Sequence, residues 1–288
     1  MLINENCKKC QLRRNINAYP PEASPGQIDA YQSGVRDILD RCDGLSTPQV
    51  AEQMYDLRRE IFGADRDYSE IKSYYNNLML SLLPYMEEQV REAEDPLAMA
   101  VRYAMVGNYI DFGAMDSVDE NVLRSQLDQA ADISVNADVM DSFRKDIIAA
   151  EQMTYFTDNC GEIVTDKLLI SVIRSLSPQL EVTVIVRSKD AVNDATTEDA
   201  KQIRMEEAAT RVIGNGNGMP GNVISEMSAE AMDAVDKADI LVSKGQGNYE
   251  GLSGCGLNIY YLFLCKCEAF MKRFNVPQFT GIMAKEEV

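Results

Sequence analysis

Two oxygen-bearing side chains, those of Asp158 and Asn159, follow a short β-prone run at residues 154–157 in the stretch TYFTDNCGEIVTD. Gly161 comes next, and a helix-like pattern begins at Glu162. In open α/β sheets ligands bind at the carboxyl ends of strands, and the free N–H groups of a helix start favour an anion. An acidic side chain at such a place indicates a bridging metal ion. The alternative is a helix cap with a tight turn, which the same residues also form.

Three further strand ends in the second half of the chain carry polar residues. The run EVTVIVRS leads into a loop with Asn193 and Asp194, a third run leads into GNGNGMPGN, and ADILVSK leads into GQGN. Each pattern alone is typical of an ordinary turn. Right-handed crossovers bring such strand ends to one edge of a sheet. The oxygens of Asp158, Asn159 and Asp194, which suit a hard cation, and Lys244, which suits a phosphate, would then lie at the same edge of the sheet, as a metal–phosphate site requires.

The composition removes several kinds of chemistry. The chain has no histidine, which excludes Ser-His-Asp and Cys-His catalysis, histidine zinc sites and imidazole acid–base chemistry. Oxygen ligands suit magnesium or manganese. Seven cysteines are an odd set, so a disulfide framework is not expected. A joint zinc site of Cys7, Cys10, Cys265 and Cys267 is an alternative to ordinary packing of these side chains, which we expect instead.

Charge and hydropathy limit the partners and the compartment. The 288 residues carry a formal net charge of −18, which argues against a general nucleic-acid binder because phosphate backbones repel such a surface. The hydrophobic content of 45% supports a real core. No apolar run approaches the roughly 20 residues that cross a bilayer, and the first residues lack the apolar segment of a signal peptide. We expect a soluble, cytoplasmic protein without membrane partners.

The elements that position these residues fall into two halves. Apolar residues at helical spacing predict helices, with no strand, over the first 150 residues. Strands alternating with helices follow, which is typical of parallel βαβ units. We therefore predict an α/β fold, with a helical domain at 1–150 and a doubly wound, mostly parallel sheet with helices on both faces at 151–288. The predicted helices are 27–42, 47–62, 69–94 (with a break at Pro84), 97–105, 118–131, 137–153, 162–176, 197–207, 225–237 and 266–273. The predicted strands are 154–157, 181–187, 210–213, 239–243, 259–264 and 280–284.

Three segments, in this order, carry a family resemblance: DNCGEIVTDKLLI, VRSKDAVNDATTEDA and ADILVSKGQGNYEGL. They closely resemble the metal-dependent damage-control phosphatases, long described as a domain of unknown function and related to a protein described as an acidic-residue methyltransferase. The amino-terminal CKKC, AVRYAMVGNYIDFG at residues 100–113 and YLFLCKCEAF near the end resemble the microbial branch. The resemblance spans nearly the whole chain.

The resemblance implies roles for individual residues. Asp158, Asn159 and Asp194 would bind a divalent metal ion, magnesium or manganese with nickel and cobalt as alternatives, and Lys244 would contact the substrate phosphate. The segments depart from the family at Asn222, where we expect threonine, and before Asn193, where many relatives have proline; both changes touch loops that select the substrate.

The implied reaction is hydrolysis of a small phosphorylated metabolite, a sugar phosphate or a phosphopantetheine-like compound. The catalytic residues would be Asp158, Asp194 and Glu162, with the first two open as nucleophile or general base, and Glu162 is alternatively a first-turn acid favoured by the helix dipole. The further residues expected on the substrate side are Asn193, Asn248, Gly161, Asn108 and Asp111. For the last two, a helix C-cap is the alternative.

Two other functions stay open from the sequence. One is an S-adenosylmethionine-dependent carboxyl methyltransferase, although the first strand is followed by DNCGE and not by a glycine-rich turn. The other is a non-catalytic protein that binds a metal or a phosphorylated metabolite.

Overall fold

The computed structural model describes residues 1–63, 67–111 and 118–286. Seven α-helices and one short 3-10 helix precede the first strand in the described chain: α1 (Glu5–Asn15), α2 (Pro25–Arg41), α3 (Thr47–Phe62), α4 (Ser69–Glu92), α5 (Pro96–Gly107), α6 (Glu120–Asp128), η1 (Ala130–Asp132) and α7 (Ala137–Ala149). Strands and helices then alternate: β1 (Gln152–Phe156), α8 (Glu162–Leu176), β2 (Glu181–Val186), α9 (Thr197–Gln202), η2 (Met205–Glu207), β3 (Arg211–Gly214), η3 (Ile224–Glu226), α10 (Ala229–Lys237), β4 (Ile240–Lys244), α11 (Gly245–Leu252), β5 (Ile259–Leu264), α12 (Glu268–Phe274) and β6 (Gly281–Glu286).

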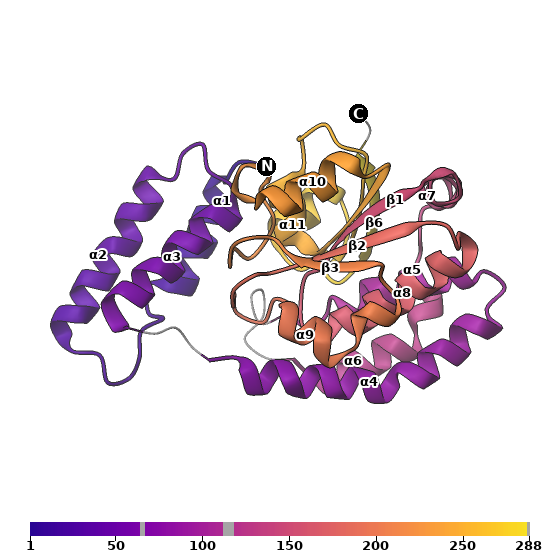
Figure 1. Cartoon of the computed structure of the whole chain (residues 1–288). Helices are drawn as coiled ribbons and strands as arrows, with labels where there is room; N and C mark the ends of the chain where they lie inside the picture. The colour runs from indigo at the N-terminus through magenta and orange to yellow at the C-terminus, as the bar shows by residue number, and fades with distance from the viewer. Residues whose placement is uncertain (64–66, 112–117, 287–288) are drawn as a thin grey trace.

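The six strands form one sheet in the order β3-β2-β1-β4-β5-β6 (Figure 1). The first five are parallel, and β6 pairs antiparallel with β5. The strand order changes direction between β1 and β4, and ligands bind outside the carboxyl ends of the strands at such a point. The predicted α/β class with a mostly parallel sheet and flanking helices is confirmed.

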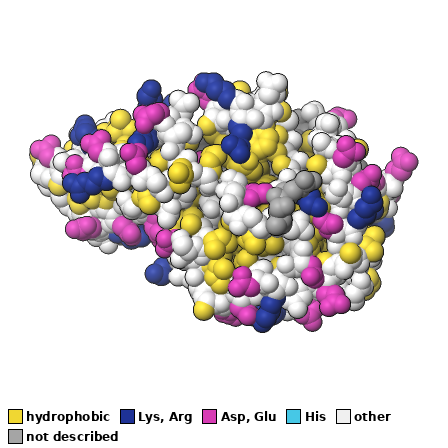
Figure 2. All heavy atoms as spheres, turned by 90° about the horizontal axis from the view of Figure 1, so that it is seen from above, with side chains coloured by type: hydrophobic (Ala, Val, Ile, Leu, Met, Phe, Trp, Pro, Cys, Tyr) yellow, Lys and Arg dark blue, Asp and Glu magenta, His cyan; other side chains and the backbone are white. Residues whose placement is uncertain are grey.

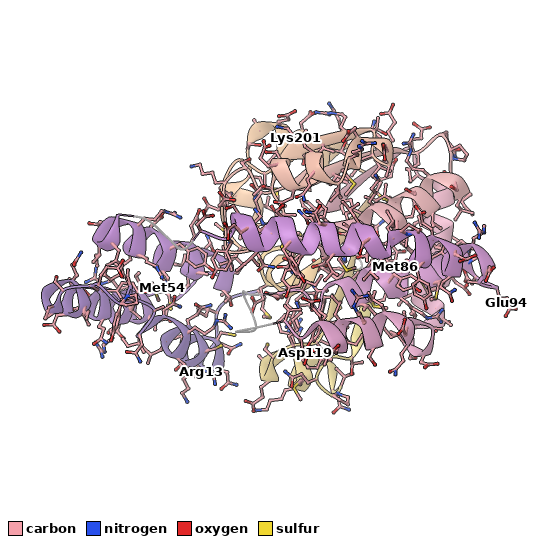
Figure 3. The ribbon with its side chains drawn as sticks, turned by 90° about the horizontal axis from the view of Figure 1, so that it is seen from below. Arg13, Met54, Met86, Glu94, Asp119 and Lys201 are labelled. Carbon is pink, nitrogen blue, oxygen red and sulfur yellow. The ribbon has the colours of Figure 1, made fainter. Side chains whose placement is uncertain are left out.

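Successive residues of β1 point to opposite faces of the sheet, as strand geometry requires. Tyr155 belongs to a large buried cluster with α4, α5, α7 and α8, whereas Phe156 belongs to a second cluster with α10, α11 and α12. Both faces are therefore covered, which explains why the strands are apolar along their whole length. In Figure 3, α4 crosses the molecule between α9, marked by Lys201, and α6, which begins after Asp119.

A third, separate cluster joins α2 and α3 and includes Tyr31, Val35 and Met54. The helices from α4 to α7 instead share the large cluster with β1 and β2. The division between hydrophobic cores thus falls after α3, whereas the predicted domain boundary lies at residue 150. Helices α4 to α7 pack against one face of the sheet and form a helical layer of the α/β fold.

Most predicted elements are present, with local differences that have physical causes. α4 runs through Pro84 without a break, because Met79 and Met86 on either side are both buried in the large cluster and offset the lost hydrogen bond. The cap of α3 is Ser46, in a capping box with Gln49, so the helix itself begins at residue 47 as predicted. The predicted helix 197–207 is two pieces, since Arg204 adopts a left-handed conformation with φ 54°.

Two of the described α-helices are absent from the predicted list: α1, where an extended arm or a short helix was the expectation, and α11. α11 follows β4 directly and begins at Gly245, which has φ 80°. Its glycines at 245, 247 and 251 lower helix propensity, so packing against β4, β5 and α3 stabilises a helix that local sequence disfavours.

Candidate active site

The loops after β1 and β2 are joined to each other at the edge of the sheet. Asn159 and Asp194 form an isolated antiparallel bridge. The N–H of Ala195 donates to the carbonyl of Asp158 at 2.7 Å, and that of Cys160 donates to the carbonyl of Asn193 at 2.8 Å. The three predicted metal ligands, Asp158, Asn159 and Asp194, are therefore held side by side by backbone hydrogen bonds.

Each of these three side chains keeps one oxygen without a hydrogen bond from the described residues. Asp158 accepts through Oδ2 from the amides of Asn108 (3.1 Å) and Asn159 (2.8 Å), which leaves Oδ1. The Nδ2 of Asn159 donates to Asp158 and, at 2.9 Å, to Glu162, which fixes the orientation of the amide and leaves its Oδ1 without a hydrogen bond within the described chain. Asp194 accepts through Oδ2 from Arg187 Nε at 2.7 Å, which leaves its Oδ1. None of the three is among the buried unpaired atoms, so they face solvent.

The start of α8 does not offer the free N–H groups that the sequence suggested. The N–H of Gly161 donates to Asn76 Oδ1 at 2.6 Å, and that of Glu162 donates to the carbonyl of Cys160 at 2.7 Å. The next two N–H groups, at residues 163 and 164, also have acceptors within the turn. With a positive φ of 69°, Gly161 closes a turn against α4, and its N–H is engaged by Asn76, which argues against the phosphate-binding role predicted for it.

Glu162 is fully buried and connects three side chains. Its Oε2 accepts from Asn108 Nδ2 and Asn159 Nδ2, both at 2.9 Å, and its Oε1 is 2.7 Å from Lys244 Nζ. With both oxygens engaged, Glu162 orients the amide of Asn159 and the amide of Asn108. This arrangement supports a positioning role for Glu162, in place of the acid–base role expected from the sequence.

Lys244 likewise has partners other than the expected phosphate. Its Nζ lies 2.7 Å from Glu162, 2.6 Å from Asp166 and 2.8 Å from the carbonyl of Ala104, and the residue is fully buried. An ammonium has three N–H donors, and these three acceptors use all of them. The side chain points into the large core because Lys244, at the end of β4, alternates with Ser243 on the strand.

Arg187 was not assigned a role from the sequence. It ends the second strand run, is 1% exposed, and donates to Asp194 through Nε and to Asn248 Oδ1 through Nη2 at 3.1 Å. The same Nη2 is 3.9 Å from Asp158 Oδ1. Asn248, expected on the substrate side, also donates to the carbonyls of Thr157 and Lys244. It ties the end of β4 to the end of β1.

Two more predicted residues line the same region. Asp111 pairs with Lys266 Nζ at 2.6 Å, and Lys266 follows β5. Asn193 is fully buried and donates to the carbonyl of Ile110 at 3.3 Å, which joins the β2 loop to the segment after α5. Residues 112–117, which include the end of the quoted GNYIDFG segment, lie outside the described residues.

Burial and mutual repulsion shift the pKa values of the acids. Burial, followed by the charges of Glu162, Asp194 and Asp111, raises the pKa of Asp158 well above its ordinary range. Burial raises the pKa of Asp194 to about 6, although Arg187 opposes the shift. Such shifts are typical of functional sites.

The charges of this cluster do not balance when every group is ionised. Within the described chain, five carboxylates are linked to three cations by the contacts given above: Asp111, Asp158, Glu162, Asp166 and Asp194 against Arg187, Lys244 and Lys266. Two negative charges remain, which either protons or a divalent cation would neutralise.

The donor set fits a hard divalent cation of the magnesium or manganese kind, through three oxygens. In the described chain no three acidic or cysteine side chains converge closely enough to hold a metal by themselves. A metal site at this place would therefore need the amide oxygen of Asn159 as its third ligand. The same finding covers Cys7, Cys10, Cys265 and Cys267, all of them free thiols, which are not assembled as a metal site.

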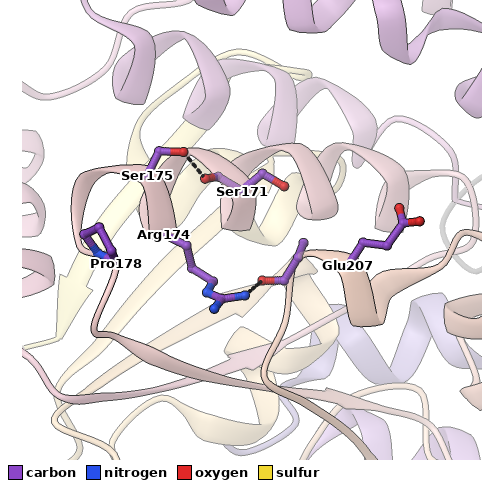
Figure 4. Close-up of a pocket in the computed structure, with 6 residues that line it drawn as sticks. Ser171, Arg174, Ser175, Pro178 and Glu207 are labelled. Atoms are coloured by element: carbon purple, nitrogen blue, oxygen red, sulfur yellow. Dashed lines mark hydrogen bonds between the residues drawn. The ribbon is translucent and has the colours of Figure 1, made fainter.

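A surface cavity of about 260 Å³ lies elsewhere, against the carboxyl-terminal half of α8 (Figure 4). Arg174 donates from it to the carbonyl of Ala208 at 3.0 Å. The site described above is at the other end of the same helix, so the cavity does not overlap it. The face in Figure 2 shows Lys and Arg side chains singly or in small groups among acidic ones. In the described residues no helix is both long and apolar enough to span a membrane.

Comparisons with known proteins agree on one family. A family model described as the damage-control phosphatase ARMT1-like domain matches residues 3–281. A damage-control phosphatase of Archaeoglobus fulgidus is 33% identical over 219 residues, which are 75% of each chain. One of Pyrococcus horikoshii is 34% identical over 181 residues, 62% of each chain. A crystal structure of a DUF89 family protein from Pyrococcus horikoshii has a TM-score of 0.83 at 24% identity and covers both chains completely, which shows the shared fold.

Proposed function

Because the chain belongs to the family of damage-control phosphatase ARMT1-like domains, we propose that it is a metal-dependent phosphatase that hydrolyses a small phosphorylated metabolite. Family membership supports the phosphatase role on damaged metabolites. The observation that carries the metal-dependent form is the set of three solvent-facing oxygens on Asp158, Asn159 and Asp194 beside a cluster with two surplus negative charges.

The chain's own residues divide the work in this proposal. Asp158, Asn159 and Asp194 would hold a magnesium or manganese ion through their free Oδ1 atoms. Such an ion, when bound, supplies Lewis-acid stabilisation of charge on the phosphoryl oxygens. Glu162 and Asn108 fix the orientation of these ligands through the hydrogen bonds described above, as outer partners of metal ligands generally do.

Hydrolysis of a phosphomonoester transfers the phosphoryl group to water and releases an alcohol and inorganic phosphate. The attacking water must lose a proton, and the carboxylates that keep a free oxygen beside the site are Asp158 and Asp194. We assign the proton transfer to this pair: a carboxylate oxygen has two lone pairs, so an Oδ1 that would hold the ion can also accept a proton from the attacking water, and the pair returns a proton to the departing alkoxide oxygen. Glu162 has both oxygens engaged and takes no part in it.

Sugar phosphates and phosphopantetheine-like compounds are the proposed substrates, because the damage-control role of the family implies small phosphorylated metabolites. The test is an assay of para-nitrophenyl phosphate and a panel of such phosphates with magnesium, manganese, nickel or cobalt, before and after a chelator. We expect activity that the chelator abolishes and that added metal restores. Asp158→Asn and Asp194→Asn should each lower kcat/KM at least about 100-fold, since each removes a charged ligand.

Asp233→Asn is the matched control, because Asp233 is an exposed acid whose one ion pair within the described residues is with Lys237 on the same helix, α10. It should leave kcat/KM unchanged. Full metal-dependent activity in both site variants would refute the assignment. Tight binding of S-adenosylmethionine without any hydrolysis would favour the methyltransferase alternative, and metal binding without turnover would favour a binding protein.

A further inference from the structure

We propose that Arg187 is the residue that binds the substrate phosphoryl group, in the place first expected for Lys244. This inference rests on the proposed phosphatase function and names a residue of the same site. Three observations support it: the position of the guanidinium, its incomplete set of partners, and the full set of partners of Lys244.

The guanidinium lies between the two acids that flank the metal position. Nε is 2.7 Å from Asp194 Oδ2, and Nη2 is 3.9 Å from Asp158 Oδ1. Both contacts come from one planar group that is 1% exposed. A phosphoryl group bound to the same cation as these carboxylates would lie within reach of this plane. An arginine suits the task because its fork of donors matches two oxygens of a phosphate.

The partners of Arg187 are incomplete. A guanidinium has five N–H donors, and Nη1 is buried without a hydrogen-bond partner in the described part of the chain. Leaving a buried charged donor unpaired is costly, so such an atom in a folded protein indicates a missing acceptor. An oxygen of a bound phosphoryl group would supply this acceptor once the guanidinium turns to bring Nη1, which no solvent reaches in this structure, toward the metal position.

The other cations near the site are less suited to this task. All three donors of Lys244 are used by Glu162, Asp166 and the carbonyl of Ala104. Lys266 is committed to Asp111 at 2.6 Å. Arg187 alone of these three touches both loops that carry the predicted metal ligands, within the residues described.

The test compares Arg187→Lys with Arg174→Lys. The lysine variant keeps a charge that can pair with Asp194 but loses the fork. Arg174 is a matched control, because its Nε is also buried without a partner while it lies at the far end of α8. Isothermal titration measures inorganic phosphate binding to the manganese-loaded proteins, and manganese binding is measured separately.

We expect Arg187→Lys to weaken phosphate binding about tenfold or more, as the loss of a charge-assisted hydrogen bond implies. Manganese binding should stay within about twofold of the wild type, and Arg174→Lys should change neither. Unchanged phosphate binding, or a parallel loss of phosphate and manganese binding, would overturn the proposal and leave Arg187 a support for Asp194.

If Arg187→Lys does not fold, a crystal structure of the wild type with manganese and inorganic phosphate gives the answer. A phosphate oxygen within hydrogen-bond distance of Nη1 supports the proposal, and a phosphate bound without that contact overturns it. The phosphatase function is tested independently, because a wild type that binds phosphate through Arg187 but hydrolyses no ester would contradict only the reaction.

Discussion

Replacing Lys244 with methionine distinguishes a structural lysine from a substrate-binding one. The side chain is fully buried, and its ammonium compensates Glu162 and Asp166. Although burial by itself lowers the pKa of Lys244, these two carboxylates raise it above its ordinary value of 10.5. The ammonium is therefore fully charged at neutral pH, and its contribution to stability is lost only when the pH rises above this range.

Removing one partner of a buried ion pair costs about 3–5 kcal/mol, because the remaining charge is left without compensation. A chain of this size loses roughly 2–4 °C in Tm per kcal/mol. Lys244→Met should thus unfold about 12 °C below the wild type, taking central values of both ranges. Calorimetry or circular dichroism measures this shift, and Lys237→Met, which removes an exposed cation paired only with Asp233, is the control.

The pH dependence of this loss has a definite sign. Burial already raises the pKa of Asp166 to about 7, with Lys244 opposing the shift. Without the lysine this pKa rises further, and an acid whose folded-state pKa is raised destabilises the fold most at high pH. The difference in Tm between Lys244→Met and the wild type should therefore become smaller as the pH falls from 8 to 6. Adding Asp166→Asn to Lys244→Met should recover part of the loss, since it removes an uncompensated charge. A variant with wild-type Tm and weakened phosphate binding would refute this reasoning and restore Lys244 as a phosphate ligand.

Three further predictions concern the ligands themselves. Gly245→Ala should weaken metal binding and activity, because a Cβ at this position would overlap the Asp158 carboxylate. Gly254→Ala is the control: Gly254 has a similar positive φ but no atom within 4 Å of the added Cβ, so this variant should lower the melting temperature through backbone strain and leave metal binding unchanged. Metal affinity, followed by titration calorimetry, should fall as the pH drops through about 6, because both Asp194, with its pKa of about 6, and Asp158, with its more strongly raised pKa, must lose a proton to bind. The fall should approach about tenfold per pH unit for each proton released, and an affinity that is constant from pH 7 to 5 would contradict this. Asn108→Ala should lower kcat/KM about 10–100-fold, as the loss of an outer partner of a metal ligand does, and an unchanged value would show that Glu162 and Asn159 hold their geometry without it.

The strand ends could be predicted from the sequence because their signals are local. β5 has the predicted bounds, and α8 begins and ends where the Asp-Asn-x-Gly turn and its apolar pattern predict. The parallel order then follows from the alternation of strands and helices. These local signals bring Asp158, Asn159 and Asp194 together before any coordinates are considered.

The partners of those residues could not be predicted, because they come from distant parts of the chain. Asn76 on α4 accepts the N–H of Gly161, and Asn108 after α5 contacts Asp158 and Glu162. No sequence spacing relates these helices to a turn more than 50 residues later. The environment of Lys244 could not be predicted either. A lysine at a strand end suits a phosphate, but the pleat of the strand decides whether its side chain faces the loops or the core.

The site therefore depends on α4 and α5 as much as on the sheet. The large hydrophobic cluster holds these helices against α8, and the same packing delivers Asn76 and Asn108 to the turn that carries the predicted ligands. Asn76 accepts the N–H of Gly161 in that turn and donates to Asp199 on α9 at 2.8 Å, whereas Asn108 donates hydrogen bonds to Asp158 and Glu162. Neutral donors of this kind orient carboxylates without cancelling their charge, which a cation would do. Asp158 and Glu162 thus keep the negative charge that would attract a metal ion although they are buried. Helices α4 and α5 therefore contribute to the electrostatic properties of the site as well as to its packing.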